Sequence, residues 1–169
     1  KKPRYVDESK CTGCGTCAEK CPVRVPNEFD MGLSSRKAIY IPFPQAVPRK
    51  YTIDAEHCLY FQKGVCRVCE RFCDRKAIDF NQKPEIIEVE VGAIVIATGY
   101  DIFDASKIPR YGYGKFDNVF TSLEFERILN ASGPTNGKIV LKDGRTPSSI
   151  AIIHCVGSRD ENYNKYCSR

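Results

Sequence analysis

The stretch that decides the fold is Cys11-Thr-Gly-Cys14-Gly-Thr-Cys17-Ala-Glu-Lys-Cys21-Pro22, with the spacing C-x2-C-x2-C-x3-C-P. Three thiolates at every third position of a tight loop can bind three corners of an iron–sulfur cube. Gly13 and Gly15 let the backbone close around the sulfurs and direct amide N–H groups at them. We expect Cys21, the fourth cysteine, to start a helix and to face away from the first cube.

A second group of cysteines indicates an internal repeat. It runs from Cys58 through seven residues to Cys66-Arg-Val-Cys69-Glu-Arg-Phe-Cys73. Similar lead-ins precede the two groups, Tyr5-Val-Asp-Glu-Ser-Lys and Tyr51-Thr-Ile-Asp-Ala-Glu-His. One structural unit was therefore used twice.

The second group departs from the first in two places. Seven residues, Leu59–Val65, stand between its first two cysteines where two are usual, and Asp74 replaces the proline. A longer loop costs little closure entropy, and Gly64 can turn it back, but it could expose the second cluster. Between the groups, Ile41-Pro-Phe-Pro-Gln-Ala-Val-Pro48 predicts an extended strap that wraps around the unit, with partner docking as the alternative.

The fourth cysteine of each group decides how the ligands are shared, because in two-cluster ferredoxins it ligates the other cluster. The first [4Fe–4S] site is then Cys11, Cys14, Cys17 and Cys73, and the second site is Cys58, Cys66, Cys69 and Cys21. Disulfides are disfavoured because no secretory leader opens the chain. Structural zinc is the stronger alternative, but three cysteines at this spacing followed by Cys-Pro favour a cube.

Charge and cysteine content divide the chain into two domains. The 169 residues carry 26 Lys+Arg and 21 Asp+Glu, a net charge of +5. All of the basic excess and eight of the ten cysteines lie in residues 1–83, before Pro84. We therefore predict a ferredoxin-like domain over 1–83 and a second domain over 84–169. Two oxidised cubes, each of about −2, would offset most of the positive charge, so it is weak support for a nucleic-acid partner.

The second domain has the pattern of α/β material. The runs 85–91, 92–99 and 149–155 predict strands, the last two buried on both faces, and His154 is then a core histidine. Thr121-Ser-Leu-Glu124 predicts a capping box for a helix to about Asn130. Lys138–Leu141 and Thr146 suggest a hairpin. These pieces do not close a sheet, so we expect the first two strands to expose edges or to find a second chain.

Four motifs together resemble a known family. They are 4–17, which includes the first cysteines, Arg36-Lys-Ala-Ile-Tyr-Ile-Pro-Phe-Pro-Gln-Ala-Val-Pro48, Gly92-Ala-Ile-Val-Ile-Ala-Thr-Gly-Tyr100 and His154-Cys-Val-Gly-Ser-Arg159. They resemble the A subunit of heterodisulfide reductase, which carries flavin and iron–sulfur clusters. The resemblance covers nearly the whole chain. It implies an α+β fold in which a two-[4Fe–4S] ferredoxin-like module is followed by an incomplete segment of a thioredoxin-reductase-like FAD domain.

The resemblance also assigns residues in the second domain. Thr98 and Gly99 match the strand end that approaches FAD in the parent subunit, where glycine allows close approach. Cys155 and Cys167 match two ligands of a further cluster whose other ligands are not in this sequence. We expect this chain to hold two [4Fe–4S] clusters and no FAD, since half of the flavin site is missing.

The function that follows is electron transfer in an oxidoreductase, with the isolated fragment not catalytically competent. The expected partners are other subunits of a heterodisulfide-reductase-type complex and ferredoxin-type donors or acceptors. We expect no nucleic acid, no membrane span and a cytoplasmic location. Two alternatives are a free-standing two-cluster ferredoxin and a structural metal module that binds nucleic acid. Because the sequence begins at Lys1 without Met, we expect it to be a fragment.

Overall fold

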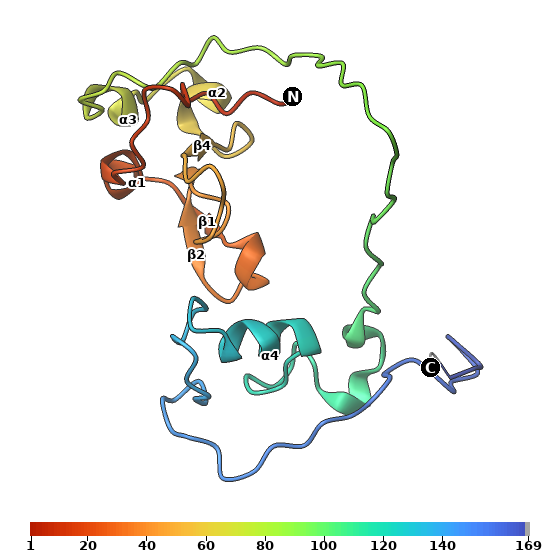
Figure 1. Cartoon of the computed structure of the whole chain (residues 1–169). Helices are drawn as coiled ribbons and strands as arrows, with labels where there is room; N and C mark the ends of the chain where they lie inside the picture. Colours follow the sequence, from red (N-terminus) through yellow and green to blue (C-terminus); the bar gives the residue numbers. More distant parts are fainter. Residues whose placement is uncertain (168–169) are drawn as a thin grey trace. The chain divides into compact units, whose positions relative to one another are not determined.

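The backbone divides into two units. The computed structural model describes residues 1–167 (Figure 1). One compact unit is Lys1–Val91, and the other begins at Gly92. The first unit thus extends past Lys83-Pro84, where composition placed the boundary.

The first helix ends, rather than begins, at the fourth cysteine. Helix α1 (Thr16–Lys20) follows Gly15, which has a φ of 96°, and its C-terminal cap is Cys21. The prediction that Cys21 starts a helix is wrong. Pro22 explains the difference, because proline disfavours helical dihedrals in the residue before it, and Cys21 is extended with φ −65° and ψ 125°.

Two further short helices belong to the second cysteine group. Helix α2 (Leu59–Lys63) fills the longer loop between Cys58 and Cys66 and ends at Gly64. Gly64 has a φ of 68°, a left-handed conformation that glycine adopts readily, so it turns the chain back as predicted. Helix α3 (Val68–Arg71) follows directly.

Short antiparallel strands connect the two groups. Strand β1 (Arg24–Pro26) pairs with β2 (Ser35–Lys37), and the 3-10 helix η1 (Glu28–Asp30) lies in the connection between them. Strand β3 (Ile39–Tyr40) pairs with β4 (Thr52–Ile53). Helices and short strands of this kind confirm the α+β class predicted for the first unit.

The segment before the first cysteine group pairs with the segment after the second. Val6 and Ile78 form an antiparallel bridge, and the Asp7 N–H donates to the Ala77 carbonyl at 2.6 Å. This pairing brings the end of the second repeat next to the beginning of the first. It therefore places Cys73 in the neighbourhood of the first cysteine loop.

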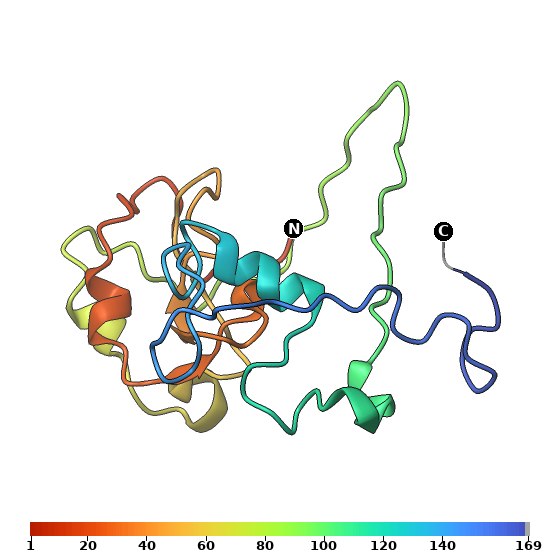
Figure 2. The same ribbon diagram turned by 90° about the horizontal axis from the view of Figure 1, so that it is seen from below.

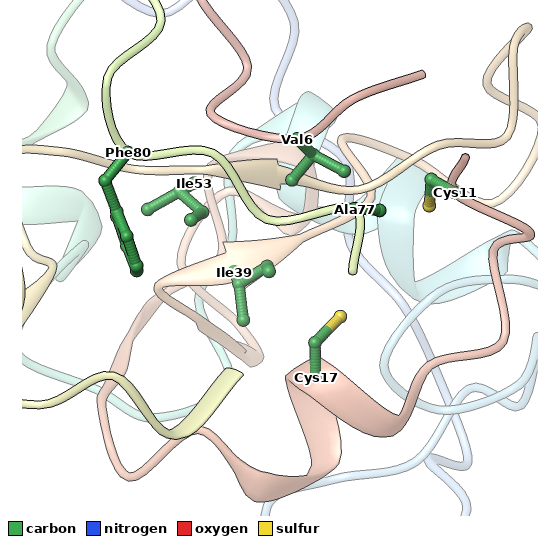
Figure 3. Packing of buried hydrophobic residues seen from close by; sticks show 7 residues of the cluster. All are labelled: Val6, Cys11, Cys17, Ile39, Ile53, Ala77 and Phe80. Atoms are coloured by element: carbon green, nitrogen blue, oxygen red, sulfur yellow. The ribbon is translucent and has the colours of Figure 1, made fainter. Parts of the chain in front are cut away.

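A small hydrophobic core joins the cysteine loops to these strands. Ile39 and Ile53 face each other across β3 and β4 and are 2% and 5% exposed. Figure 3 shows Cys11 and Cys17 at one side of the cluster and Phe80 at the other. The buried members of the core are Val6, Cys11, Cys17, Ile39, Ile53, Ala77 and Phe80.

The second unit contains little regular structure. Its elements are the 3-10 helices η2 (Ala105–Lys107) and η3 (Pro109–Tyr111) and the helix α4 (Ser122–Leu129). The capping box at α4 is confirmed. The Thr121 hydroxyl accepts from the Glu124 N–H at 3.3 Å, and the Glu124 carboxylate accepts from the Thr121 N–H at 2.6 Å.

The strands predicted in 85–99 and 149–155 are not formed. Within the described part of the chain, these runs contain no strand, and 85–98 follows an extended path in both views (Figures 1 and 2). A strand is stabilised by a ladder of hydrogen bonds to a neighbouring strand. Among the described residues these runs have only one such backbone pairing, at Glu85, whose N–H donates to the Lys1 carbonyl at 2.9 Å and whose carbonyl accepts from the Lys1 N-terminus. Their apolar side chains are consequently exposed, namely Ile86, Val89, Ile94, Val95, Ile96 and Ile152.

Two smaller predictions in this unit are also wrong. The hairpin is reduced to a turn, in which the Leu141 N–H donates to the Arg145 carbonyl at 2.7 Å. His154 lies in an exposed turn instead of a core strand. The position of His154 follows from the unpaired strands, because without a sheet there is no core for this side chain to enter.

Candidate metal centres

Four cysteines from both groups meet at one cavity in the first unit. Cys11, Cys14, Cys17 and Cys73 all line a cavity of about 160 Å³. Cys11 and Cys17 are buried, whereas Cys14 is exposed and its Sγ lies 3.6 Å from the Thr16 hydroxyl. These are the four residues predicted for the first site, and the pairing around Val6 is what brings Cys73 to it.

The other four cysteines line a second, tighter cavity. Cys21, Cys58, Cys66 and Cys69 surround a volume of about 20 Å³. The rest of this lining is apolar and comes from β3, β4 and helices α2 and α3, together with Pro22, Val23 and Ala38. The structure therefore gathers the residues predicted for the second site as well, including Cys21 from the other group.

Each cavity has the donors that an iron–sulfur cube requires. Thiolates hold such clusters, four to a cube, and four thiols converge at each site. Among residues 1–167, no three His, Cys, Asp or Glu side chains are already placed to hold a single metal ion. The ligand assignments themselves stay predictions, but the chemistry and the number of the donors fit the group.

One thiol at each site, Cys17 at the first and Cys69 at the second, has a raised pKa. Burial raises the pKa of Cys17 to about 12, and the nearby Cys11 and Cys14 add to the effect. Burial likewise raises the pKa of Cys69 to about 12, with contributions from Cys58 and the other thiols of its site. Two thiolates close together repel, so burial and repulsion both favour the protonated form of Cys17 and Cys69. Cationic iron reverses this preference, and we expect its binding to release protons.

The two residues that follow the strap, Arg49 and Lys50, lie against the first cysteine loop. A Cβ on Gly13, whose φ is 75°, would lie 2.7 Å from the Arg49 carbonyl oxygen. Lys50 donates from Nζ to the Cys11 carbonyl. Glycine is thus needed at position 13 because another backbone segment approaches it closely. The prediction that 41–48 is an extended strap is wrong, because the segment is a series of bends and turns in which the Ala46 N–H donates to the Phe43 carbonyl at 3.0 Å.

A buried ion pair supports the entry to the second cysteine group. The Arg36 side chain is 8% exposed and lies 2.8 Å from the Asp54 carboxylate, which also contacts His57 Nδ1 at 2.8 Å. Burial alone would raise the pKa of Asp54, but the hydrogen bonds from Arg36 and His57 outweigh it and leave that pKa lowered. The Asp54 carbonyl accepts from the Cys58 N–H at 2.9 Å. The ion pair therefore fixes the backbone that presents Cys58.

Three residues near the sites carry no signal in the sequence. Lys37 donates from Nζ to the Cys21 carbonyl at 2.5 Å, Lys50 contacts Cys11, and Arg36 pairs with Asp54. Each lies well apart in the chain from its partner and outside the cysteine motifs, and although Arg36 and Lys37 open the motif 36–48, that motif does not indicate these contacts. Only the tertiary packing shows their role.

The site residues predicted in the second unit are all exposed. Thr98 and Gly99 lie on the extended run, and apart from the chain neighbours of Gly99 no atom of the described residues comes within 4 Å of its Cβ position. Cys155 and Cys167 are exposed too. Their predicted roles toward FAD and toward a further cluster stay predictions.

No helix within residues 1–167 is both long enough and apolar enough to cross a bilayer.

The comparison with models of protein families gives the class of protein. Residues 4–27 match the model of the 4Fe-4S binding domain, so the chain is an iron–sulfur protein. This match favours an iron–sulfur cluster over structural zinc at the first cysteine group.

The comparison with curated relatives then gives the family. The chain is 54% identical to the A subunit of the H(2):CoB-CoM heterodisulfide,ferredoxin reductase of Methanothermobacter thermautotrophicus, over 100% of this chain and 25% of the relative. It is 62% identical to the second iron-sulfur A subunit of the CoB–CoM heterodisulfide reductase of Methanopyrus kandleri, over 99% of this chain and 25% of the relative. It is 45% identical to the A subunit of the ferredoxin:CoB-CoM heterodisulfide reductase of Methanosarcina mazei, over 100% of this chain and 21% of the relative.

The chain belongs to the family of heterodisulfide reductase A subunits, as the resemblance in its motifs predicted. It spans about a quarter of the length of the curated relatives it matches.

Proposed function

We propose that this chain is the electron-transfer module of a heterodisulfide reductase of this family and holds two [4Fe–4S] clusters. The observation that carries the proposal is the pair of cavities, each lined by three cysteines from one group and one from the other. Crossed sharing of this kind is the arrangement of two-cluster ferredoxins. The two sites then belong to one folded unit, so electrons can pass between them.

The chain's own residues bind the clusters and shield them. Cys11 and Cys17 are buried, while Cys14 stands at the exposed side of the first site. Ile39 and Ile53 contribute to the apolar wall of the second site and exclude water there. When bound, the clusters carry single electrons, which lets a two-electron flavin exchange with one-electron partners.

The second unit is proposed to be part of the FAD domain of the parent subunit. The exposed apolar runs at 92–98 and 150–153 support this, because they have the composition of buried strands and lack sheet neighbours among the described residues. Thr98 and Gly99 would then lie near FAD in the parent. FAD itself is expected to be bound by the full-length parent, not by this chain.

The names of the relatives suggest the partners. All three are named as subunits of a reductase, and two of them as acting with ferredoxin. We propose that the parent of this chain likewise works in a multi-subunit complex and exchanges electrons with a ferredoxin-type protein. A cytoplasmic location and the absence of a nucleic-acid partner stay predictions.

Metal and flavin analysis of anaerobically prepared protein tests the proposal. Two cubes' worth of iron and sulfide, without zinc or flavin, is the expected content. Cys14→Ser should perturb only the first site and Cys66→Ser only the second, as seen by electron paramagnetic resonance. Cys155→Ser is the matched control and should leave both signals unchanged.

Two outcomes would contradict the proposal in different ways. Zinc in place of iron would remove the electron-transfer function altogether. Stoichiometric FAD in the isolated chain would leave that function intact but overturn the assignment of the flavin to the parent alone. A free-standing ferredoxin is not favoured, because the whole chain aligns with these much longer reductase relatives.

A further inference from the structure

Each cysteine site has one lysine whose ammonium group is held against the backbone of a ligand cysteine. At the second site, Lys37, the last residue of β2, donates from Nζ to the Cys21 carbonyl at 2.5 Å. At the first site, Lys50, which follows the strap, donates from Nζ to the Cys11 carbonyl. Neither lysine belongs to a cysteine motif, and each reaches a different site.

The surrounding packing holds both lysines in place. The Lys50 N–H donates to the Pro48 carbonyl at 2.8 Å, and its carbonyl accepts from Arg4 at 3.2 Å, so its backbone is bonded on both sides. Lys37 lies opposite Arg24 in the register of β1 and β2. Because both positions are set by backbone pairing, the charges are fixed features of the fold.

Burial makes these two charges more effective than other lysines nearby. Lys37 and Lys50 are both half-buried, and solvent screens a half-buried charge less than an exposed one. Lys10 and Lys20 directly precede Cys11 and Cys21 in the chain, but their side chains are 58% and 44% exposed. Each also lies near a carboxylate, Asp7 at 3.1 Å for Lys10 and Glu19 at 3.5 Å for Lys20.

A fixed positive charge at such a site has a direct redox consequence. Reduction adds one negative charge to a group that four thiolates already make anionic. A cation held nearby stabilises the reduced state more than the oxidised state and raises the reduction potential. Local charge is one of the factors that set the potential of protein-bound clusters.

We propose that Lys37 and Lys50 are positioning residues that tune the two clusters separately, Lys37 raising the potential of the second site and Lys50 that of the first. The inference rests on the proposed function, since it assumes that both sites hold clusters. The inference adds that the reduction potential of each cluster is set separately by its own lysine. The difference in potential between the two clusters, and with it the favoured direction of electron flow, would then depend on two side chains outside the cysteine motifs.

Anaerobic redox titration of the cluster-loaded full-length protein, followed by electron paramagnetic resonance, tests this assignment. Lys37→Met should shift the midpoint of the second cluster to more negative values, and Lys50→Met that of the first. A change on the order of tenfold in the equilibrium constant corresponds to ~59 mV for a one-electron couple. Lys37→Arg and Lys50→Arg keep the charge and should retain midpoints near that of the unaltered protein.

Matched controls separate a charge effect from a structural one. Lys10→Met and Lys20→Met remove exposed charges next to the same cysteines and should shift the midpoints much less. Lys37→Gln and Lys50→Gln keep a hydrogen-bond donor without the charge, and should shift the midpoints as the Met variants do. The iron content of every variant is measured alongside.

The possible failures can be told apart. Unaltered protein without iron would refute the proposed function itself. Normal iron content with unchanged midpoints in the Met variants would overturn only the tuning by lysine. Loss of iron from one site in a Met variant, with an unchanged midpoint in the corresponding Gln variant, would show a purely structural role and also overturn it.

Discussion

The two units of this chain contain similar apolar residues but bury them very differently. In the first unit, Ile39 and Ile53 are 2% and 5% exposed, whereas in the second unit Ile94 and Ile96 are 82% and 83% exposed. Both pairs lie in short β-branched runs that a pattern-based prediction treats alike. The runs therefore differ in their partners and not in their composition.

The internal repeat is what supplies partners in the first unit. The segment around Val6 pairs with the segment around Ile78, and β3 pairs with β4. Two copies of a motif within one chain thus complete each other's hydrogen bonds and share their cysteines. The second unit has no comparable copy among the described residues, and its candidate strands stay unpaired. A buried strand needs both its own pattern and a neighbour within reach.

The largest expected difference between the units is their response to iron removal. Metal binding and folding are coupled where ligands come from distant parts of a chain, as Cys21 and Cys73 do here. Chelation should therefore abolish hydrogen-exchange protection throughout 4–80 and leave the protection of α4 unchanged. Mass spectrometry of peptides from both regions measures this. Equal loss in both units would show that they fold as one and break the comparison.

The second-largest expected difference between the units is the change in the free energy of unfolding when an isoleucine side chain is truncated. Ile39→Ala removes a fully buried side chain, and such substitutions cost about 2–5 kcal/mol. Ile94→Ala, the matched control, removes an exposed side chain and should change the free energy of unfolding by less than about 0.5 kcal/mol. Anaerobic urea titration of cluster-loaded protein, followed by visible absorbance, gives both values. A comparable cost for Ile94→Ala would mean that its run is buried.

The ion pair before the second cysteine group should have a somewhat smaller effect. Arg36→Met leaves the Asp54 carboxylate, which is 12% exposed, without its buried cation. Breaking a buried pair costs about 3–5 kcal/mol, and the remaining contact with His57 reduces this to roughly 2–3 kcal/mol. Arg24→Met on exposed strand β1 is the control. The same urea titration measures both, and indistinguishable midpoints would show that the pair is not structural.

The smallest effect is expected in the second unit. Thr121→Ala removes one half of the capping box of α4 and should cost about 1 kcal/mol in local stability. Hydrogen exchange of the amides in 122–129 measures the change, and Thr121→Ser should restore protection. If the alanine variant exchanged at the original rate, other contacts would be holding the helix.

The predictions that were confirmed depend on local chemistry. The capping box at Thr121 and the turn at Gly64 follow from side chains and dihedrals a few residues apart. The strands predicted at 92–99 and 149–155 failed because a strand depends on a distant neighbour. The helix predicted at Cys21 failed for a local reason that the sequence already contained, since Pro22 sets the dihedrals of the residue before it.

By itself the sequence determined the iron–sulfur character, the eight candidate ligands and the two-unit organisation, because cysteine spacing and repeats are properties of the chain. The tertiary structure alone decided the surroundings of those ligands. It placed Lys37 against Cys21, Lys50 against Cys11 and Arg36 against Asp54. These contacts join residues far apart in the chain, where no local preference determines the geometry. They depend on how the segment between the two cysteine groups packs against them.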